Sequence, residues 1–161
     1  MAEIATATRL VRALAARGLT CATAESCTGG GVGRAITDVA GASAVFPGGV
    51  ISYANAVKRD VLGVPAAVLD GEGPVSAACA AAMAQGVRAL LKTDLAVSVT
   101  GVAGPGGDGV HPAGFVWFGL ATPAGVTTEQ KTFPGDRAAV RAAAVEHALA
   151  LLLRTADVFG I

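Results

Sequence analysis

The 161-residue chain contains few aromatic or charged residues and has no excess of either charge. Lysine and arginine total 12, aspartate and glutamate also total 12, and aromatic residues make up 4% of the chain. Nucleic-acid-binding domains usually carry a basic surface, so the zero net charge argues against a nucleic-acid partner. With 53% hydrophobic residues, the chain is too apolar for an intrinsically disordered protein.

Long hydrophobic runs are also missing, although the mean hydropathy is positive at +0.59. A membrane-spanning helix needs about 20 consecutive apolar residues, and the longest apolar stretch, 77–84, is short and mostly alanine. Glu3 places an acidic residue where a secretory signal carries basic ones. We therefore expect no membrane partner and a cytoplasmic location.

Residues that bind metals are scarce. Cysteine occurs at Cys21, Cys27 and Cys79, and histidine at His111 and His147. These spacings match none of the common zinc patterns, so we expect no metal ion. Three cysteines also cannot all pair within one chain.

The apolar pattern predicts helices that alternate with strands, followed by a β-hairpin. Helices are expected over 3–17, from the glycines near 30 to about 40, and over 56–62, 77–92 and 137–154, with a short one after Pro65. Strands are expected over 19–24, 49–54, 95–100, 114–122 and 126–133. Expected N-caps are Asn55, Ser76 and Asp136. This order predicts an α/β fold, a single three-layer α/β/α domain over 1–161 with a mixed sheet.

The segment AESCTGGG (24–31) lies where a predicted strand runs into a helix start. Backbone N–H groups at a helix start favour an anion, either a phosphate or a developing oxyanion. Consecutive glycines would let such a ligand approach the backbone. A simple N-cap with a flexible first turn explains the same residues equally well. Neither the P-loop pattern nor the dinucleotide G-x-G-x-x-G spacing is present.

A second segment, SYANAVKR (52–59), contains Tyr53 and Lys58. If Asn55 caps the helix, Lys58 lies in its first turn, where the helix dipole disfavours a cation. A lowered amine pKa is what a general base requires. The alternative is an exposed lysine on a surface helix, as for most lysines.

Two further segments lie later in the chain. The loop 100–114, TGVAGPGGDGVHPAG, follows a buried strand, and loops of this length are usually functional or disordered. In PGDRAAVR (134–141), Arg137 follows the expected cap and either binds a phosphate or carboxylate or is merely solvated.

In this order, these segments resemble the CinA C-terminal-domain family, whose stand-alone members are nicotinamide-nucleotide amidohydrolases. The matching strings are TAESCTGG (23–30), ITDVAGAS (36–43), GGVISYANAVKRDVLGV (48–64), GPVS (73–76), TGVAGPGG (100–107), GFVWFGLA (114–121) and PGDRAAVR (134–141). Several strings are long and unusual, which makes the match far more specific than a lone glycine motif. The resemblance is to the single-domain form of the family.

The resemblance implies an enzyme of the pyridine nucleotide cycle that hydrolyses the carboxamide of nicotinamide mononucleotide to nicotinate mononucleotide and ammonia. Family enzymes are Ser/Lys hydrolases, so Ser26 would be the nucleophile and Lys58 the base, with Tyr53 supporting the catalytic site. The implied substrate-binding residues are Cys27, Thr28, Gly29, Gly30, Asn55, Thr100, Gly101, Gly104 and Arg137. Either Arg137 or the 101–107 loop would hold the nucleotide phosphate. No metal or organic cofactor would be needed.

Two features leave alternatives open. Many family members carry a lysine where this chain has His111, so phosphate affinity here is expected to be weaker or pH-sensitive if that lysine contacts phosphate. Cys27 is predicted to lie at a helix start, which lowers a thiol pKa, so a cysteine amidohydrolase is a variant of the same hypothesis. A non-catalytic nucleotide-binding or regulatory domain of a competence- or damage-inducible protein is the alternative from another class.

The alanine-rich helices 77–92 and 138–153 carry small residues around much of their circumference. Such helices pack closely, either inside a domain or against a second subunit, so a homodimer is a further expectation.

Overall fold

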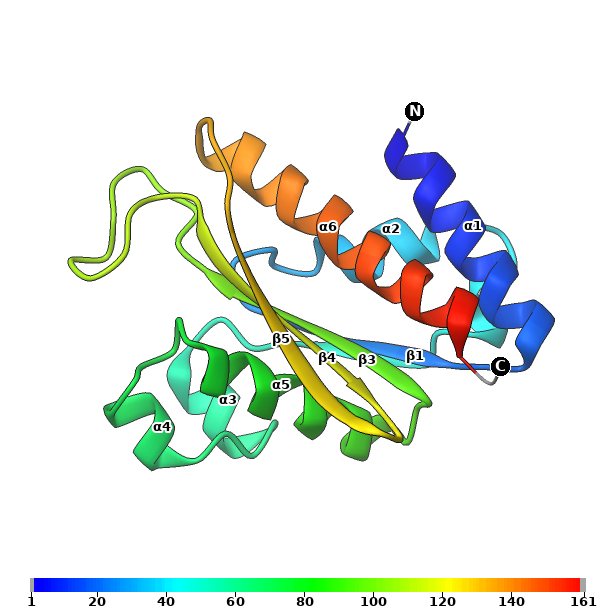
Figure 1. Cartoon of the computed structure of the whole chain (residues 1–161), viewed down its shortest axis with the longest axis horizontal. Helices are drawn as coiled ribbons and strands as arrows, with labels where there is room; N and C mark the ends of the chain where they lie inside the picture. The colour runs from blue at the N-terminus through cyan, green and yellow to red at the C-terminus, as the bar shows by residue number, and fades with distance from the viewer. Residues whose placement is uncertain (1, 160–161) are drawn as a thin grey trace.

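A five-stranded sheet lies between two layers of helices in the computed structural model, which describes residues 2–159 (Figure 1). The strands are β1 (Cys21–Glu25), β2 (Gly48–Ile51), β3 (Leu95–Gly101), β4 (Phe115–Thr122) and β5 (Gly125–Thr132). Their order in the sheet is β2-β1-β3-β4-β5. The first three strands are parallel and the β4–β5 hairpin is antiparallel to β3, so the predicted mixed sheet is confirmed.

Helices cover both faces of this sheet. One face carries α1 (Ala2–Arg17), α2 (Gly31–Thr37) and α6 (Arg137–Val158), and the other carries α3 (Asn55–Asp60), α4 (Ala66–Asp70) and α5 (Ala77–Leu91) (Figure 1). A short 3-10 helix, η1 (Ala42–Ala44), follows α2. The α/β/α layering predicted from the sequence is therefore confirmed.

Each face of the sheet has its own apolar core. Leu14 of α1 and Leu149 of α6 are fully buried in the larger core, and Met83 of α5 is fully buried in the other. Strand β3 lies in the middle of the sheet and is covered on both faces, which explains its continuous run of apolar and small residues.

Two of the three predicted N-caps are confirmed. Ser76 Oγ accepts a hydrogen bond from the Cys79 N–H at 3.1 Å, and Asp136 Oδ1 accepts one from the Ala139 N–H at 2.9 Å. The prediction for Asn55 is wrong, because β2 ends at Ile51 and the chain turns one residue earlier than expected. Ala54 takes the extended N-cap conformation and Asn55 is the first residue of α3.

Three helix ends also differ from the prediction. Helix α2 ends at Thr37 instead of near residue 40, α3 ends at Asp60 instead of 62, and α6 continues to Val158 instead of 154. The alanine-rich helices use their small residues for packing inside the domain, since Ala80 and Ala84 of α5 and Ala144 and Ala148 of α6 are all fully buried. The homodimer therefore stays a prediction.

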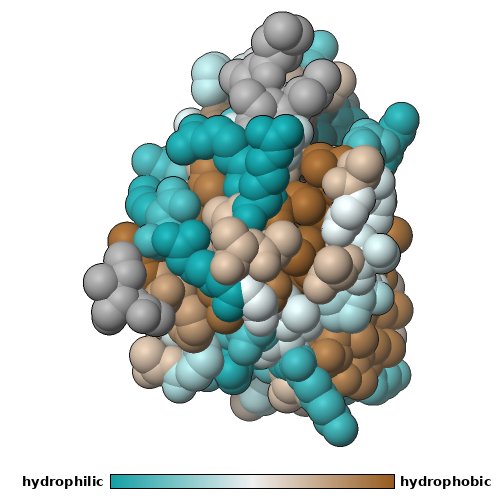
Figure 2. All heavy atoms as spheres, turned by 90° about the vertical axis from the view of Figure 1, so that its right-hand side faces the viewer, coloured by the Kyte–Doolittle hydropathy of each residue, from teal (hydrophilic) through white to brown (hydrophobic). Residues whose placement is uncertain are grey.

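None of the helices within residues 2–159 is long and apolar enough to cross a membrane. Hydrophilic and hydrophobic residues are interspersed over the face shown in Figure 2. Polar side chains thus interrupt the apolar surface on this face.

The close approach of α5 to the sheet predicts the effect of one added methyl group. A Cβ at Gly119 of β4 would lie 2.3 Å from the Ala80 carbonyl oxygen and 2.6 Å from Ser98 Oγ. We expect Gly119→Ala to lower the free energy of unfolding by about 1–3 kcal/mol through overpacking, measured by urea denaturation.

Gly33→Ala is the matched control for this prediction. A Cβ at Gly33 would meet its neighbours at 3.4 Å or more, which is ordinary contact, and alanine favours the helix. Equal stability of the Gly119→Ala variant and the unsubstituted protein would contradict the tight packing of α5 on β4.

Candidate active site

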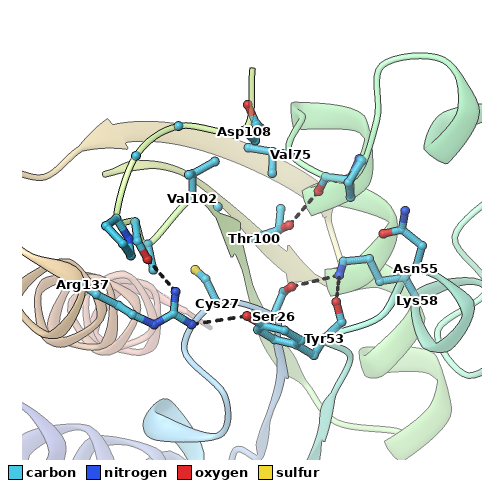
Figure 3. Close-up of a pocket in the computed structure, with 17 residues that line it drawn as sticks. Ser26, Cys27, Tyr53, Asn55, Lys58, Val75, Thr100, Val102, Asp108 and Arg137 are labelled. Atoms are coloured by element: carbon cyan, nitrogen blue, oxygen red, sulfur yellow. Dashed lines mark hydrogen bonds between the residues drawn. The ribbon is translucent and has the colours of Figure 1, made fainter. Parts of the chain in front are cut away.

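A cavity of about 360 Å³ opens at the carboxyl ends of the parallel strands, beside the long loop that follows β3 (Figure 3). In open α/β sheets, this edge is where ligands usually bind. The cavity brings together nine of the residues predicted from the sequence: Ser26, Cys27, Tyr53, Asn55, Lys58, Thr100, Gly101, Gly104 and Arg137. They come from the segments after β1 and β2, from α3, from the end of β3 and its loop, and from α6.

Lys58 and Ser26 are in direct contact at the floor of this cavity. Lys58 Nζ lies 2.9 Å from Ser26 Oγ, 2.7 Å from the Ser52 carbonyl oxygen and 3.1 Å from the Tyr53 carbonyl oxygen (Figure 3). The lysine side chain is 1% exposed, and no carboxylate among the described side chains, residues 6–159, forms an ion pair with it. The amine is therefore held by neutral oxygen atoms alone.

Burial lowers the pKa of Lys58, because it removes the ammonium form from water, and the nearby Cys79 and Cys27 thiols oppose this shift only in part. The predicted direction of the shift is thus confirmed, but the predicted cause is wrong. Lys58 is the fourth residue of the six-residue α3, beyond the first turn. Removal from water, not the helix dipole, therefore favours the neutral amine.

Ser26 opens a tight turn, residues 26–30, which we call the Ser26 turn. Its N–H donates to the Val99 carbonyl at 2.9 Å, and its carbonyl accepts from the Gly29 N–H at 3.1 Å. The carboxylate of Glu25 accepts hydrogen bonds from the Val32 and Gly33 N–H groups at 2.8 and 3.0 Å. The start of α2 is therefore occupied by a side chain of the protein itself, which leaves these two donors unavailable to a substrate anion.

The glycines of this turn give room to neighbouring side chains. A Cβ at Gly30 would lie 3.0 Å from Ile51 Cδ1, and one at Gly31 would lie 2.8 Å from Val145 Cγ2. Gly29 and Gly30 do not line the cavity, and neither does the buried Thr28. The structure thus does not bring these three predicted residues into the site, and the glycine run serves internal packing.

At the mouth of the cavity, Arg137 connects two other elements. Its Nη1 donates to the Gly104 carbonyl at 2.6 Å and its Nη2 to the Tyr53 hydroxyl at 3.3 Å (Figure 3). The Tyr53 side chain is mostly exposed and lies beside Arg137, while the Tyr53 carbonyl contacts Lys58. Arg137 and the glycine loop, the two elements predicted to bind the phosphate, are therefore in contact with each other at the mouth of the cavity.

The rest of the wall comes from β3 and from residues that the sequence analysis missed. Thr100 Oγ1 donates to the Pro74 carbonyl at 2.6 Å, which attaches the end of β3 to the segment before α5. Missed residues at or beside the site are Glu25, Ser52, Pro74, Val75, Asp108 and Arg141. Glu25 had a visible signal, since it is an acidic residue between a buried strand and a helix start.

His111 lies beside the cavity wall without lining the cavity itself. Its ring stacks on Phe115 at 4.4 Å, and its Nδ1 lies 3.2 Å from Asp108 Oδ2. Asp108 in turn lines the cavity. Where the structure describes the side chains, at residues 6–159, no three His, Cys, Asp or Glu side chains come close enough to hold a metal ion.

Burial raises the pKa of the Cys27 thiol to about 11, and the nearby Lys58 and Arg141 lower it only in part. The predicted lowering at a helix start is therefore wrong, because α2 begins only at Gly31 and Glu25 fills its first N–H groups. At neutral pH Cys27 is a protonated thiol, whereas a cysteine nucleophile needs the thiolate.

A comparison with protein families identifies this arrangement. The family model of the CinA C-terminal domain matches residues 3–156. The chain belongs to this family. Curated relatives include a CinA-like protein of Synechococcus sp. (strain RCC307), 50% identical over 147 residues, which are 89% of this chain and 35% of the relative. The chain thus spans about a third of the length of that longer CinA relative.

Other relatives match over nearly their whole length. A nicotinamide-nucleotide amidohydrolase PncC of Enterobacter agglomerans is 47% identical over 144 residues, 88% of each chain. The crystal structure of the competence damage-inducible protein A of Klebsiella pneumoniae is 38% identical, covers 98% of both chains and gives a TM-score of 0.94. The competence/damage inducible protein of Agrobacterium tumefaciens gives a TM-score of 0.92 at 37% identity.

The raised thiol pKa values predict how the cysteines react. Burial raises the pKa of Cys21 to about 12 and that of Cys79 to about 11, as for Cys27. We expect iodoacetamide at about pH 8 to leave all three unmodified in the folded protein and to alkylate all three after denaturation, measured by mass spectrometry. Rapid alkylation of Cys27 in the folded protein would restore the cysteine nucleophile as a candidate.

Proposed function

We propose that the chain is an amidohydrolase that converts nicotinamide mononucleotide to nicotinate mononucleotide and ammonia, with Ser26 as nucleophile and Lys58 as base. The observation that carries this proposal is the 2.9 Å contact between Lys58 Nζ and Ser26 Oγ in a buried position. A serine hydroxyl is a weak nucleophile until a base in hydrogen-bond reach takes its proton. Lys58 is the group in that position.

The hydrogen bonds of Lys58 support its role as a base. A neutral amine has two N–H donors and one lone pair. The carbonyl oxygens of Ser52 and Tyr53 can only accept hydrogen bonds, so they take the two N–H groups. The lone pair is then directed at the third neighbour, the Ser26 hydroxyl, which can donate its proton.

The reaction then proceeds in two balanced steps. The Ser26 proton passes to Lys58 while Oγ forms a bond to the carboxamide carbon, and an oxyanion develops on the carbonyl oxygen. Collapse breaks the C–N bond, and the Lys58 ammonium supplies the proton with which the amide nitrogen leaves as ammonia. Lys58 next takes a proton from a water molecule whose oxygen bonds to the ester carbon. The bond from that carbon to Ser26 Oγ then breaks, and the Lys58 ammonium returns its proton to Oγ. The acid that is released loses its own proton to the ammonia and leaves as the carboxylate.

The mouth of the cavity supports binding of the phosphate. Arg137 supplies a guanidinium, a strong partner for a phosphate group. Within residues 2–159, the backbone N–H groups of Gly106 and Gly107 at the cavity wall donate to no protein acceptor. The volume of about 360 Å³ falls in the range of small-molecule sites. We therefore place the nicotinamide ring at Ser26 and the phosphate near Arg137.

The relatives support the choice of substrate. The PncC protein of Enterobacter agglomerans matches over nearly its full length, so the likeness includes the whole of that amidohydrolase and not a fragment of it. A role in the pyridine nucleotide cycle, in the cytoplasm, follows from this proposal.

The proposed reaction can be tested by measuring ammonia release from nicotinamide mononucleotide by the purified protein. We expect Ser26→Ala and Lys58→Ala to lower kcat by about 10³-fold or more, because each removes one member of a unit that acts together. A coupled ammonia assay measures the rate. Lys131→Ala, which changes an exposed lysine on β5, is the matched control and should keep the full rate.

Two other outcomes are informative. Full activity of Ser26→Ala, with loss of activity in Cys27→Ala, would overturn the serine mechanism. Thermal stabilisation by pyridine nucleotides with no ammonia release would favour the non-catalytic nucleotide-binding alternative.

A second prediction follows from the lowered pKa of Lys58. The base must be neutral, so the reaction is slow below its pKa and faster above it. We expect kcat/KM to rise with pH, with a midpoint below the ordinary lysine value of 10.5. A profile measured across the neutral and alkaline range that climbs only near the ordinary value would exclude Lys58 as the base.

A further inference from the structure

A second arginine of α6, Arg141, lies against the Ser26 turn without lining the cavity. Its Nε donates to the Cys27 carbonyl at 3.0 Å, and its Nη2 lies 3.3 Å from the Thr28 carbonyl. No carboxylate of residues 6–159, whose side chains the structure describes, forms an ion pair with Arg141. One planar guanidinium thus holds two consecutive carbonyls of the turn that presents Ser26.

These hydrogen bonds from Arg141 fix the directions of the backbone N–H groups in the turn. In a trans peptide the N–H and C=O groups point in opposite directions. The Cys27 carbonyl points at Arg141, so the Thr28 N–H points away from it. The Ser26 carbonyl points into the turn, toward the Gly29 N–H at 3.1 Å, so the Cys27 N–H points out of the turn.

Some backbone N–H groups of the Ser26 turn donate hydrogen bonds within the protein, and others do not. The N–H of Ser26 donates to the Val99 carbonyl at 2.9 Å, and the N–H of Gly29 donates within the turn. The N–H groups of Cys27 and Thr28 donate to no oxygen atom of residues 6–159, and the Cys27 N–H lies near the sulfur of its own side chain, which is a weak acceptor. Cys27 follows Ser26 directly and lines the cavity, so its N–H is the free donor best placed for an anion formed at Ser26.

We propose that Arg141 is a positioning residue that locks the peptide planes of the Ser26 turn, so that the Cys27 N–H stabilises the oxyanion formed when Ser26 attacks. This inference rests on the proposed role of Ser26 as nucleophile. Donors fixed in advance toward a developing charge are among the largest contributions to catalysis. Arg141 acts through the backbone and touches no substrate.

The packing of α6 matches this role. Arg137, Arg141 and Val145 lie at i, i+4 and i+8, on one face of the helix. A Cβ at Gly29 would lie 3.2 Å from Arg141 Nη2, and a Cβ at Gly31 would lie 2.8 Å from Val145 Cγ2. The glycines thus let the guanidinium reach the turn, and its rigid fork suits two carbonyls better than a lysine would.

The test uses a fluorophosphonate probe on the full chain. The Ser26 Oγ–P bond forms, the P–F bond breaks, fluoride leaves and the hydroxyl proton passes to Lys58, with negative charge held on the phosphoryl oxygen. We expect Arg141→Ala to slow labelling of Ser26 by about 10- to 100-fold. The Arg141→Lys variant should be labelled faster than Arg141→Ala but more slowly than the unsubstituted protein. A low concentration of guanidinium should accelerate labelling of the Arg141→Ala variant and should not affect the unsubstituted protein. Mass spectrometry gives the rates.

Arg88→Ala is the matched control, because Arg88 Nε donates to the Asp94 carbonyl at 2.9 Å in an equally half-buried position on α5. It should be labelled at the rate of the unsubstituted protein. The inference is overturned if folded Arg141→Ala is labelled at the unsubstituted rate, or if its slow labelling is unaffected by guanidinium. If Arg141→Ala does not fold, the same comparison is made with Arg141→Lys, whose unchanged rate would overturn the inference.

Ammonia release separates this inference from the proposed function. With nicotinamide mononucleotide, Arg141→Ala should lower kcat and leave KM within about twofold, because it affects the transition state and not the binding of the substrate. An unsubstituted protein that is labelled at Ser26 but releases no ammonia would refute the substrate and leave the role of Arg141 intact. Absence of labelling at Ser26 would refute the nucleophile and Arg141 together.

Discussion

The arrangement of the site depends on one buried amine that has no counter-ion among the side chains that the structure describes. Lys58 is 1% exposed and is held by a hydroxyl and two carbonyl oxygens. Removing an ammonium from water costs free energy, and neutral oxygens return only part of it. The fold therefore favours the neutral amine, and this same state is the one that can accept a proton from Ser26. A carboxylate beside Lys58 would have stabilised the ammonium and removed the base.

Holding Ser26 in front of that amine requires a backbone turn fixed from several sides. The Val99 carbonyl of β3 accepts from the Ser26 N–H, the Glu25 carboxylate holds the start of α2, and Arg141 holds the carbonyls of Cys27 and Thr28. The contacts with Val99 and Arg141 come from elements far from Ser26 in the sequence. The turn is therefore a product of the assembled sheet and of α6, and short local peptides would not reproduce it.

The sequence predicted the layers and most of the site because both depend on local patterns. The continuous apolar run of β3, the caps Ser76 and Asp136, and the hairpin follow from periodicity and cap chemistry. The cavity then collects Ser26 and Lys58 because parallel strands end at one edge of the sheet. The cause of the Lys58 pKa shift could not be predicted, since burial depends on neighbours from other parts of the chain, such as Ser26 and Cys79, and not on position along α3.

The neighbours of the first glycine cluster could not be predicted for a related physical reason. A glycine in a sequence indicates that something comes close to the backbone, but not what comes close. Here the neighbours of Gly29, Gly30 and Gly31 are Arg141, Ile51 and Val145, which reach the turn only after folding. The glycines in the loop after β3 do line the cavity, at Gly104, Gly106 and Gly107.

The glycines at 29–31 and those in the loop after β3 thus have different structural roles. The difference follows from which parts of the protein cover each cluster. The first is covered by α6 and β2, so its glycines let protein side chains approach and keep Ser26 fixed. The second lies at the mouth of the cavity, where Arg137 and the Gly104 carbonyl meet. Its free N–H groups leave space for a ligand. A rigid turn at the nucleophile and open backbone at the entrance suit a site that must orient one reacting group and admit an anionic substrate.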